Sequence, residues 1–206
     1  EAAASHPGVR GVFTGQDFPF RVGLYLGDKP PLARNKVRYY GEPVAAVVAD
    51  TEANALAAAA RIRVKYGELP VVHTPSEGLA SDAPIIHEEL AEYNHIPAIL
   101  PEPGSNVGNR TRIRKGDIEH GFKEAAVVVE GEYAFPPGDH VAMEPRIAVA
   151  EVEASGQIVI RSSTQSPYGV RTIMSNCLDI PAGKITVIAP AVGGGFGGKA
   201  GIQLEP

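Results

Sequence analysis

Hydrophobic and polar residues alternate along the first part of the chain in a way that predicts both strands and a helix. The apolar run at 44–48 indicates a strand, and the alanine-rich stretch 52–62 after it indicates a helix. Either Asp50 or Thr51 can cap that helix. Residues 62–66, IRVKY, alternate apolar and polar side chains as a half-buried strand does. We therefore expect a compact α+β unit here.

The middle of the chain has a different pattern. From Leu79 to about Asn109 there are several prolines and no sustained hydrophobic period. We expect an extended connector, with bounds of 81–116, between a first domain at 1–80 and a second domain at 117–206.

The second domain again mixes periods. A short helix is predicted from Asp117, and the apolar stretch 126–133 predicts a strand. Residues 146–153 and 157–164 alternate on either side of Ala154-Ser155-Gly156. Because glycine accepts a positive φ, these two segments predict a β-hairpin.

A helix and a strand should follow the hairpin. Apolar residues at i, i+3, i+4, i+7 and i+8 predict one buried helix face that ends before Pro181: Val170, Ile173, Met174, Cys177 and Leu178. Met174 and Cys177 are thus expected in the core. The segment 184–188, KITVI, reads as a strand. The whole chain is predicted to be α+β.

Composition and charge narrow the function classes. The net charge is -5 and the basic residues are scattered, which disfavours nucleic acid or anionic lipid as a partner. No apolar run is long enough to cross a membrane and no signal-peptide pattern is visible, so we expect a cytoplasmic location. Cys177 is the only cysteine, so this chain alone cannot form a disulfide or hold an iron–sulfur cluster.

The stretch 190–199, PAVGGGFGGK, carries the candidate chemistry. It matches two phosphate-binding patterns only in part. The P-loop pattern fails at Ala200, where a hydroxyl should hold magnesium, and too few residues follow Gly198 for a dinucleotide-binding unit. Consecutive glycines still expose backbone N–H groups and allow a bulky anionic or metal-bound ligand to approach. A flexible linker is the alternative, although Phe196 within the loop and a predicted strand before it argue against one.

Several segments together resemble the molybdenum hydroxylases, the family of xanthine dehydrogenase, aldehyde oxidase and carbon monoxide dehydrogenase. VGGGFGGK at 192–199 is similar to their molybdenum-cofactor loop, and 39–66 is similar to their α/β hammerhead domain. NVGNRTRIRKGDIEHGF resembles the connector, and HVAMEPRIAVAEV resembles the opening of the cofactor domain. The family's STQ segment is present here as SSTQSP, with Gln165 thirty-one positions before Phe196. The resemblance implies a hammerhead domain followed by an incomplete molybdopterin-binding domain.

The resemblance also implies roles for single residues. Gln165 would hydrogen-bond an oxygen on molybdenum, and the backbone of Phe196 and Gly197 would approach the metal, with no direct protein ligand. Gly194 and Gly195 would give the cofactor room. The substrate pocket would include the Phe196 side chain and the residue at position 200.

Three residues near these positions keep open roles. Lys199 can be solvated or can pair with a carboxylate. His140 and Glu144 match a family signature, but each can equally be a structural residue.

The sequence departs from the family at the positions that set the substrate. Xanthine dehydrogenases carry a glutamate where this chain has Ala200, so a purine substrate is in doubt and aldehydes and N-heteroaromatic compounds stay open. The GGK triplet differs from the asparagine-containing loop typical of carbon monoxide dehydrogenases, and no counterpart of their active-site cysteine is visible. Oxidation of carbon monoxide is therefore disfavoured.

The resemblance implies an oxidoreductase that hydroxylates its substrate with water as oxygen donor. Its cofactor would be molybdopterin with molybdenum, in the cytosine dinucleotide form, and iron–sulfur and FAD subunits would be partners. The family's general base is a glutamate far downstream, and Glu205 is too close to the loop to take that role. We therefore expect no catalytic residue in this chain, a fragment or split subunit, and no activity of the chain alone. The alternatives are a non-catalytic scaffold and a P-loop-like nucleotide-binding module.

Overall fold

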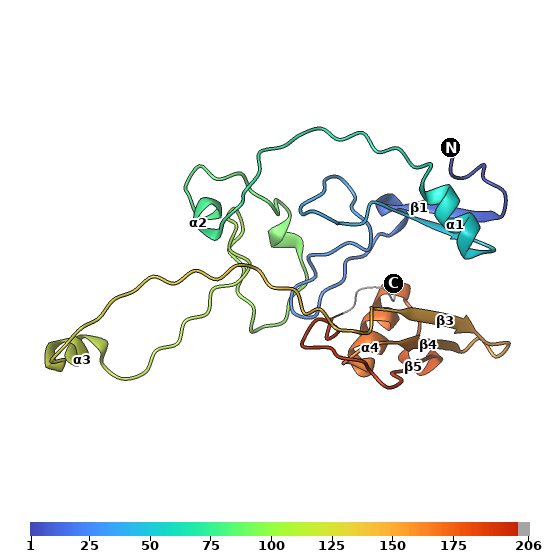
Figure 1. Cartoon of the computed structure of the whole chain (residues 1–206). Coiled ribbons are helices and arrows are strands. Elements are labelled where there is room, and N and C mark those ends of the chain that lie inside the picture. Colours follow the sequence, from blue (N-terminus) through green and yellow to red (C-terminus); the bar gives the residue numbers. More distant parts are fainter. Residues whose placement is uncertain (202–206) are drawn as a thin grey trace.

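The computed structural model describes residues 1–201, and Glu205 lies outside the described residues. The N-terminal part contains an antiparallel pair of strands, β1 (Val9–Thr14) and β2 (Ala45–Ala49), and a helix, α1 (Glu52–Ala59). Thr51 caps α1, because its side chain accepts a hydrogen bond of 3.2 Å from the Asn54 N–H. The predicted strand and helix are confirmed, and the helix ends slightly earlier than expected (Figure 1).

Two details of this part differ from the sequence prediction. Residues 62–66 form no strand, so that prediction was wrong. A strand needs a partner edge, and within residues 1–201 the β1–β2 sheet stops at two strands and leaves Val64 and Tyr66 exposed. The strand β1 was missed because Gly11 interrupts its apolar pattern, at a place where the pairing register also shifts.

The middle of the chain is mostly extended, as predicted. It contains only short helical turns, α2 (Pro75–Gly78) and the 3-10 turn η2 (Leu90–Glu92). The Asn106 side chain donates to the carbonyls of Gly78 and Pro84, each at 3.0 Å. Polar side chains thus take the place of a regular ladder in holding these loops.

The helix predicted from Asp117 is α3 (Ile118–Glu124), which the Asp117 side chain caps by accepting from the His120 N–H. It lies at the end of a long extended arm, away from both sheets (Figure 1). The strand predicted at 126–133 is absent, which is a second correction. Val127 and Val129 are exposed, and nothing in the described part of the chain pairs with this segment.

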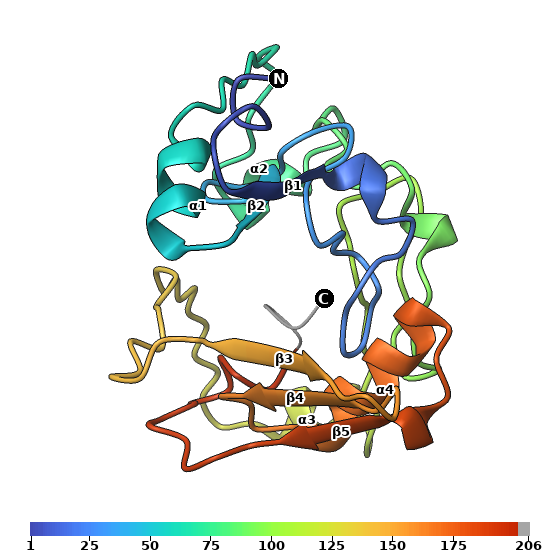
Figure 2. The ribbon, with the colours of Figure 1, turned by 90° about the vertical axis from the view of Figure 1, so that its right-hand side faces the viewer.

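The C-terminal part agrees closely with the prediction. The hairpin is β3 (Ala148–Val152) and β4 (Ile158–Ser162), with Gly156 at φ +78° in the turn. The helix α4 (Pro167–Leu178) and the 3-10 turn η3 (Ala182–Lys184) follow, and then β5 (Ile185–Ile188) pairs parallel to β4. The sheet order is β3-β4-β5, in a different part of the molecule from β1 and β2 (Figure 2).

The hydrophobic core of the C-terminal part lies between α4 and this sheet. It is formed by Val22, Ile160, Val170, Met174 and Ile185. Cys177 packs against this cluster, and burial raises the pKa of its thiol, so it is a core residue rather than a nucleophile. Val22 comes from the N-terminal part, so the core also joins the two parts of the chain.

The topology decides where the loops meet. Since β3 is antiparallel and β5 parallel to β4, the chain before β3, after β4 and after β5 comes to one edge of the sheet. The α+β class is confirmed. Among residues 1–201, no helix has the length and apolar character to cross a membrane.

Candidate functional site

The edge of the β3-β4-β5 sheet brings together three segments that are distant in sequence. The two segments stay together past the hairpin strands, because the Ile147 N–H donates to the Ser163 Oγ at 3.0 Å and the Ser163 N–H donates to the Ile147 carbonyl at 3.1 Å. Continued in the same register, residues 144–146 lie opposite 164–166. The glycine loop, 193–199, returns to the same edge after β5 and lies against both segments.

Gln165 holds the end of the glycine loop in three places. Its backbone N–H donates to the Lys199 carbonyl at 2.9 Å, and its side-chain Oε1 accepts from the N–H groups of Gly197, at 3.1 Å, and Lys199, at 3.2 Å. Since both loop N–H groups need an acceptor, the side-chain amide must be oriented with its oxygen toward the loop. The Nε2 group has no acceptor within residues 1–201 and remains available as a donor.

The loop backbone needs its glycines. Gly194 and Gly197 have φ of +99° and +88°, and a Cβ on Gly195 would lie 2.4 Å from the Gln165 Cδ. Phe196 also has a positive φ, +49°, which is strained for an aromatic residue. The N–H groups of 194–196 have no acceptor in the described part of the chain, so the tip presents three consecutive donors.

The side chains predicted for the substrate pocket differ in their exposure. Phe196 is 74% exposed, which contradicts a role as a hydrophobic plug that anchors the loop. Ala200 is half-buried, and its N–H donates to the Gly197 carbonyl. Only Phe196 therefore offers a large apolar surface at this point.

Lys199 and Glu144, whose roles the sequence left open, form an ion pair. The Lys199 Nζ lies 2.6 Å from the Glu144 Oε2, and the lysine is only 4% exposed. The same Oε2 accepts from the Gly193 N–H at 2.8 Å. The Lys199 ammonium, and secondly the Gly193 amide, hold the pKa of the Glu144 carboxyl below its ordinary value.

Two further residues contact the loop. The guanidinium of Arg146 donates to the Gly198 carbonyl at 2.9 Å, and the ring of His140 lies so close that a Cβ on Gly198 would be 2.8 Å from it. Sequence reasoning did not connect these residues with the loop. The predicted hairpin supplies only part of this arrangement, because extending its pairing past 148 and 162 sets 144–146 opposite 164–166 but does not bring in the glycine loop.

The site is suited to holding a group with oxygen acceptors rather than to binding a bare metal ion. Gln165 Nε2 and the amides of 194–196 are all hydrogen-bond donors. Among residues 1–201, no group of three His, Cys, Asp or Glu side chains could hold a metal. Metal chemistry here would thus depend on a cofactor that carries its metal with it.

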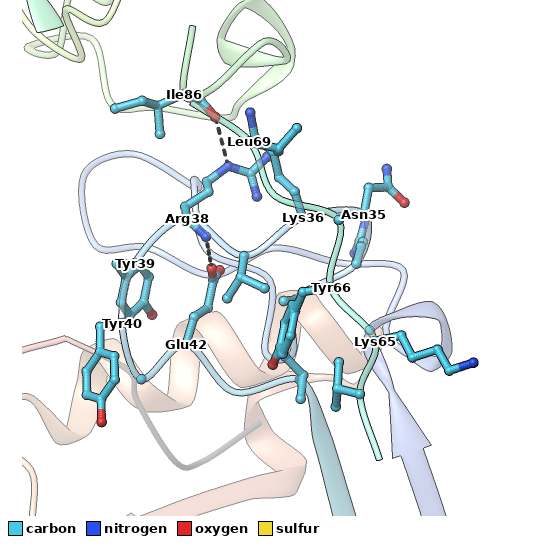
Figure 3. Close-up of a pocket in the computed structure, with 18 of the residues that line it drawn as sticks. Asn35, Lys36, Arg38, Tyr39, Tyr40, Glu42, Lys65, Tyr66, Leu69 and Ile86 are labelled. Carbon is cyan, nitrogen blue, oxygen red and sulfur yellow. Dashed lines mark hydrogen bonds between the residues drawn. The ribbon is translucent and has the colours of Figure 1, made fainter. Parts of the chain in front are cut away.

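A hollow also lies in the N-terminal part, between 33–45 and the extended segment 62–72 (Figure 3). Two of its cations bind neighbouring loops: Lys36 pairs with Glu88 at 2.6 Å, and the Arg38 Nε donates to the Ile86 carbonyl at 3.1 Å. These contacts tie loops together. The glycine loop is therefore the better candidate site.

Comparison with protein families agrees with this site. Residues 100–206, just over half of the chain, match the molybdopterin cofactor-binding domain. The chain belongs to the molybdenum hydroxylase family. Residues 1–70 match the α/β hammerhead domain of aldehyde oxidase and xanthine dehydrogenase, so the predicted resemblance is confirmed over both parts.

Individual relatives in this family are oxidoreductases. The xanthine dehydrogenase molybdenum-binding subunit of Escherichia coli O157:H7 is 34% identical in an alignment 218 positions long, which covers 100% of this chain and 27% of that subunit. The nicotinate dehydrogenase large molybdopterin subunit of Eubacterium barkeri is 30% identical over 185 residues, 90% of this chain and 40% of its own length. The chain thus spans between about a quarter and two fifths of these relatives.

Solved structures of the family share the fold. Reconstituted carbon monoxide dehydrogenase from Oligotropha carboxidovorans matches with a TM-score of 0.81 and 29% identity, over 97% of this chain and 26% of that one. Quinoline 2-oxidoreductase from Pseudomonas putida 86 matches with a TM-score of 0.77 and 32% identity, over 96% and 25%. Enzymes with different substrates therefore carry the same two-part fold.

Proposed function

We propose that this chain forms one wall of the molybdenum-cofactor site in an oxidoreductase that hydroxylates a small substrate with water as oxygen donor. The observation that carries the proposal is the donor set at the sheet edge. The Gln165 Oε1 accepts hydrogen bonds from the loop, which leaves the Nε2 group free to donate, next to the free amides of 194–196. A match of 100–206 to the molybdopterin cofactor-binding domain supports the same reading.

Each residue would then have a distinct task. Gln165 would donate from Nε2 to an oxygen of the cofactor, and the glycines at 194, 195 and 197 would let the cofactor lie close to the backbone. Phe196 would cover one side of the substrate. When bound, the cofactor would supply Lewis acidity and the redox change.

Proton transfer is not assigned to the described residues. The carboxylate closest to the loop, Glu144, is held in an ion pair by Lys199 and has its pKa lowered, so it is a poor proton acceptor. We therefore expect the general base to come from another part of the working enzyme, and the 206-residue chain alone to be inactive.

The finer features of the enzyme stay predictions. We expect the pterin in its cytosine dinucleotide form, iron–sulfur and FAD subunits as redox partners, and a cytoplasmic location. Ala200 has a methyl group where a purine-orienting carboxylate would stand, which favours an aldehyde or N-heteroaromatic substrate over a purine. The domain bounds at residues 80 and 116, which rest on the change in sequence pattern, also stay predictions.

The proposal is tested by isolating the native assembly that contains this chain and measuring molybdenum by mass spectrometry. We expect nearly one molybdenum per copy of the chain, together with flavin and iron–sulfur polypeptides. A preparation with intact assembly and no molybdenum would contradict the proposal. That result would favour the alternative, a scaffold that retains the fold without the chemistry.

A further inference from the structure

A single oxygen atom closes the glycine loop. The Glu144 Oε2 accepts from the N–H of Gly193, at the start of the loop, and from the Nζ of Lys199, at its end. The Glu144 N–H also donates to the Gly193 carbonyl at 3.3 Å. One side chain that precedes β3 therefore links the two ends of the loop.

The free-energy cost of burying the Lys199 ammonium indicates that the Glu144–Lys199 pair differs from an ordinary surface ion pair. Lys199 is 4% exposed, and burying an ammonium is strongly unfavourable unless a charge partner and hydrogen bonds compensate. The Glu151–Arg161 pair in the same sheet is different, because both side chains are at least half exposed. An exposed pair of that kind contributes little.

The buried lysine and its carboxylate partner are connected directly to the proposed cofactor donors. Lys199 uses its backbone N–H and its backbone carbonyl to bind Gln165, while its side chain binds Glu144. A shift of Lys199 would thus disturb one of the two backbone N–H groups that hold the Gln165 side-chain oxygen, and also the carbonyl that accepts from the Gln165 backbone. The three tip amides lie between the two ends that Glu144 holds.

We propose that Glu144 and Lys199 are positioning residues that aim Gln165 Nε2 and the loop amides at the molybdenum cofactor. Neither residue is required to touch the cofactor or the substrate. The inference rests on the proposed function, because it assumes that the cofactor is the group that these donors meet. The competing interpretation is that the pair only stabilises the fold.

The experiment uses the complete molybdenum subunit assembled with its partners, with Glu144→Gln and Lys199→Met as variants. Glu144→Gln keeps an oxygen for the Gly193 N–H but removes the charge. Lys199→Met keeps an apolar stem of similar length. Glu151→Gln is the matched control, since it removes the charge of an exposed pair in the same sheet.

Four quantities separate the two interpretations: molybdenum per subunit, kcat, KM, and the electron paramagnetic resonance spectrum of the Mo(V) state. We expect both variants to lower molybdenum content or kcat by roughly 10–100-fold, as loss of outer contacts to a metal site does. We also expect KM to change little and the Mo(V) spectrum to be altered. Glu151→Gln should match the wild type in all four.

A different pattern overturns the inference. If the melting temperature falls while the Mo(V) spectrum, metal content and kcat stay at wild-type values, the pair is structural only. If Lys199→Met does not accumulate, Glu144→Gln decides alone, because it replaces one oxygen by an amide nitrogen. A wild-type enzyme without molybdenum would refute the proposed function itself, and this is seen before any variant is compared.

Discussion

The side-chain oxygen of Gln165 lies 3.1 Å from the backbone nitrogen of Gly197, across 32 positions of sequence. This contact orients the amide, because the oxygen must face the loop and the NH₂ group must then face away from it. The donor that the family resemblance requires is thus set by the loop itself. A substitution can therefore separate the contribution of the Nε2 donor from that of the Oε1 acceptor.

Changing Gln165 to glutamate removes the donor and keeps the acceptor. Both carboxylate oxygens can accept from the loop amides, so we expect the melting temperature to stay within a few degrees. Loss of the Nε2 donor should lower kcat by about 10–100-fold in the complete enzyme. Steady-state kinetics and thermal unfolding measure the two effects.

The control for that variant is Gln157→Glu. Gln157 is a half-buried glutamine whose Nε2 donates to the Thr186 hydroxyl and the Gly183 carbonyl, away from the loop. It should leave kcat unchanged. Equal losses of kcat in both variants would show that Gln165 has no special role.

Gly195→Ala should destabilise the loop. Its Cβ would lie 2.4 Å from the Gln165 Cδ, so the loop or the glutamine must move, at a cost of roughly 1–3 kcal/mol. Chemical denaturation gives the free energy of unfolding, and molybdenum content should fall with it. Gly183→Ala is the control, because its Cβ would meet nothing within 4 Å. Wild-type stability and metal content in Gly195→Ala would contradict the packing described here.

The core helix gives a prediction that is independent of the cofactor. Met174 is 4% exposed in the cluster between α4 and the sheet, so Met174→Ala should cost about 2–5 kcal/mol of unfolding free energy. Leu178, which the sequence pattern placed on the buried face of the same helix, is in fact 42% exposed and should cost clearly less when changed to alanine. Urea denaturation of both variants measures the difference, and the reverse order would contradict the assigned core face.

The ion pair predicts a dependence of stability on pH. The pKa of Glu144 is lowered in the folded state, mainly by the Lys199 ammonium, so ionised Glu144 stabilises the fold above the unfolded pKa of about 4.3. This contribution is lost as the pH falls through the lower, folded pKa. The difference in unfolding free energy between wild type and Glu144→Gln should be constant from about pH 7 to 5 and shrink below about pH 4. A difference that grew on acidification would have the wrong sign.

Some of the elements that sequence periodicity predicted correctly have partners close in sequence, whereas the correctly predicted β2 and β5 pair with strands that are distant in sequence. The β3–β4 hairpin and α4 each have a clear period and neighbours close in sequence, and both were found. The strands predicted at 62–66 and 126–133 have an equally clear pattern but were not found. Alternation reports only which side chains prefer burial, and a strand forms only where a free edge accepts its backbone.

The site was predictable in part for a related reason. The glycine loop and Gln165 were identified through the resemblance, but no pattern joined Glu144 to Lys199. Their contact spans 55 positions and depends on the β5 crossover, which periodicity cannot supply. The predicted hairpin indicates one part of the site, because its pairing, extended past both strands, places 144–146 opposite the residues after β4.

The distances along the chain also order the steps of assembly. The hairpin joins residues 148–162 across a short turn, whereas the loop contacts of Gln165 and Glu144 close segments of 34 and 55 positions. Longer closures carry a larger entropic cost and form later. We therefore expect the sheet to fold first, as a receptor with Glu144 and Gln165 already side by side, and the glycine loop to dock onto it afterwards. Cofactor insertion would then belong to the last stage of maturation.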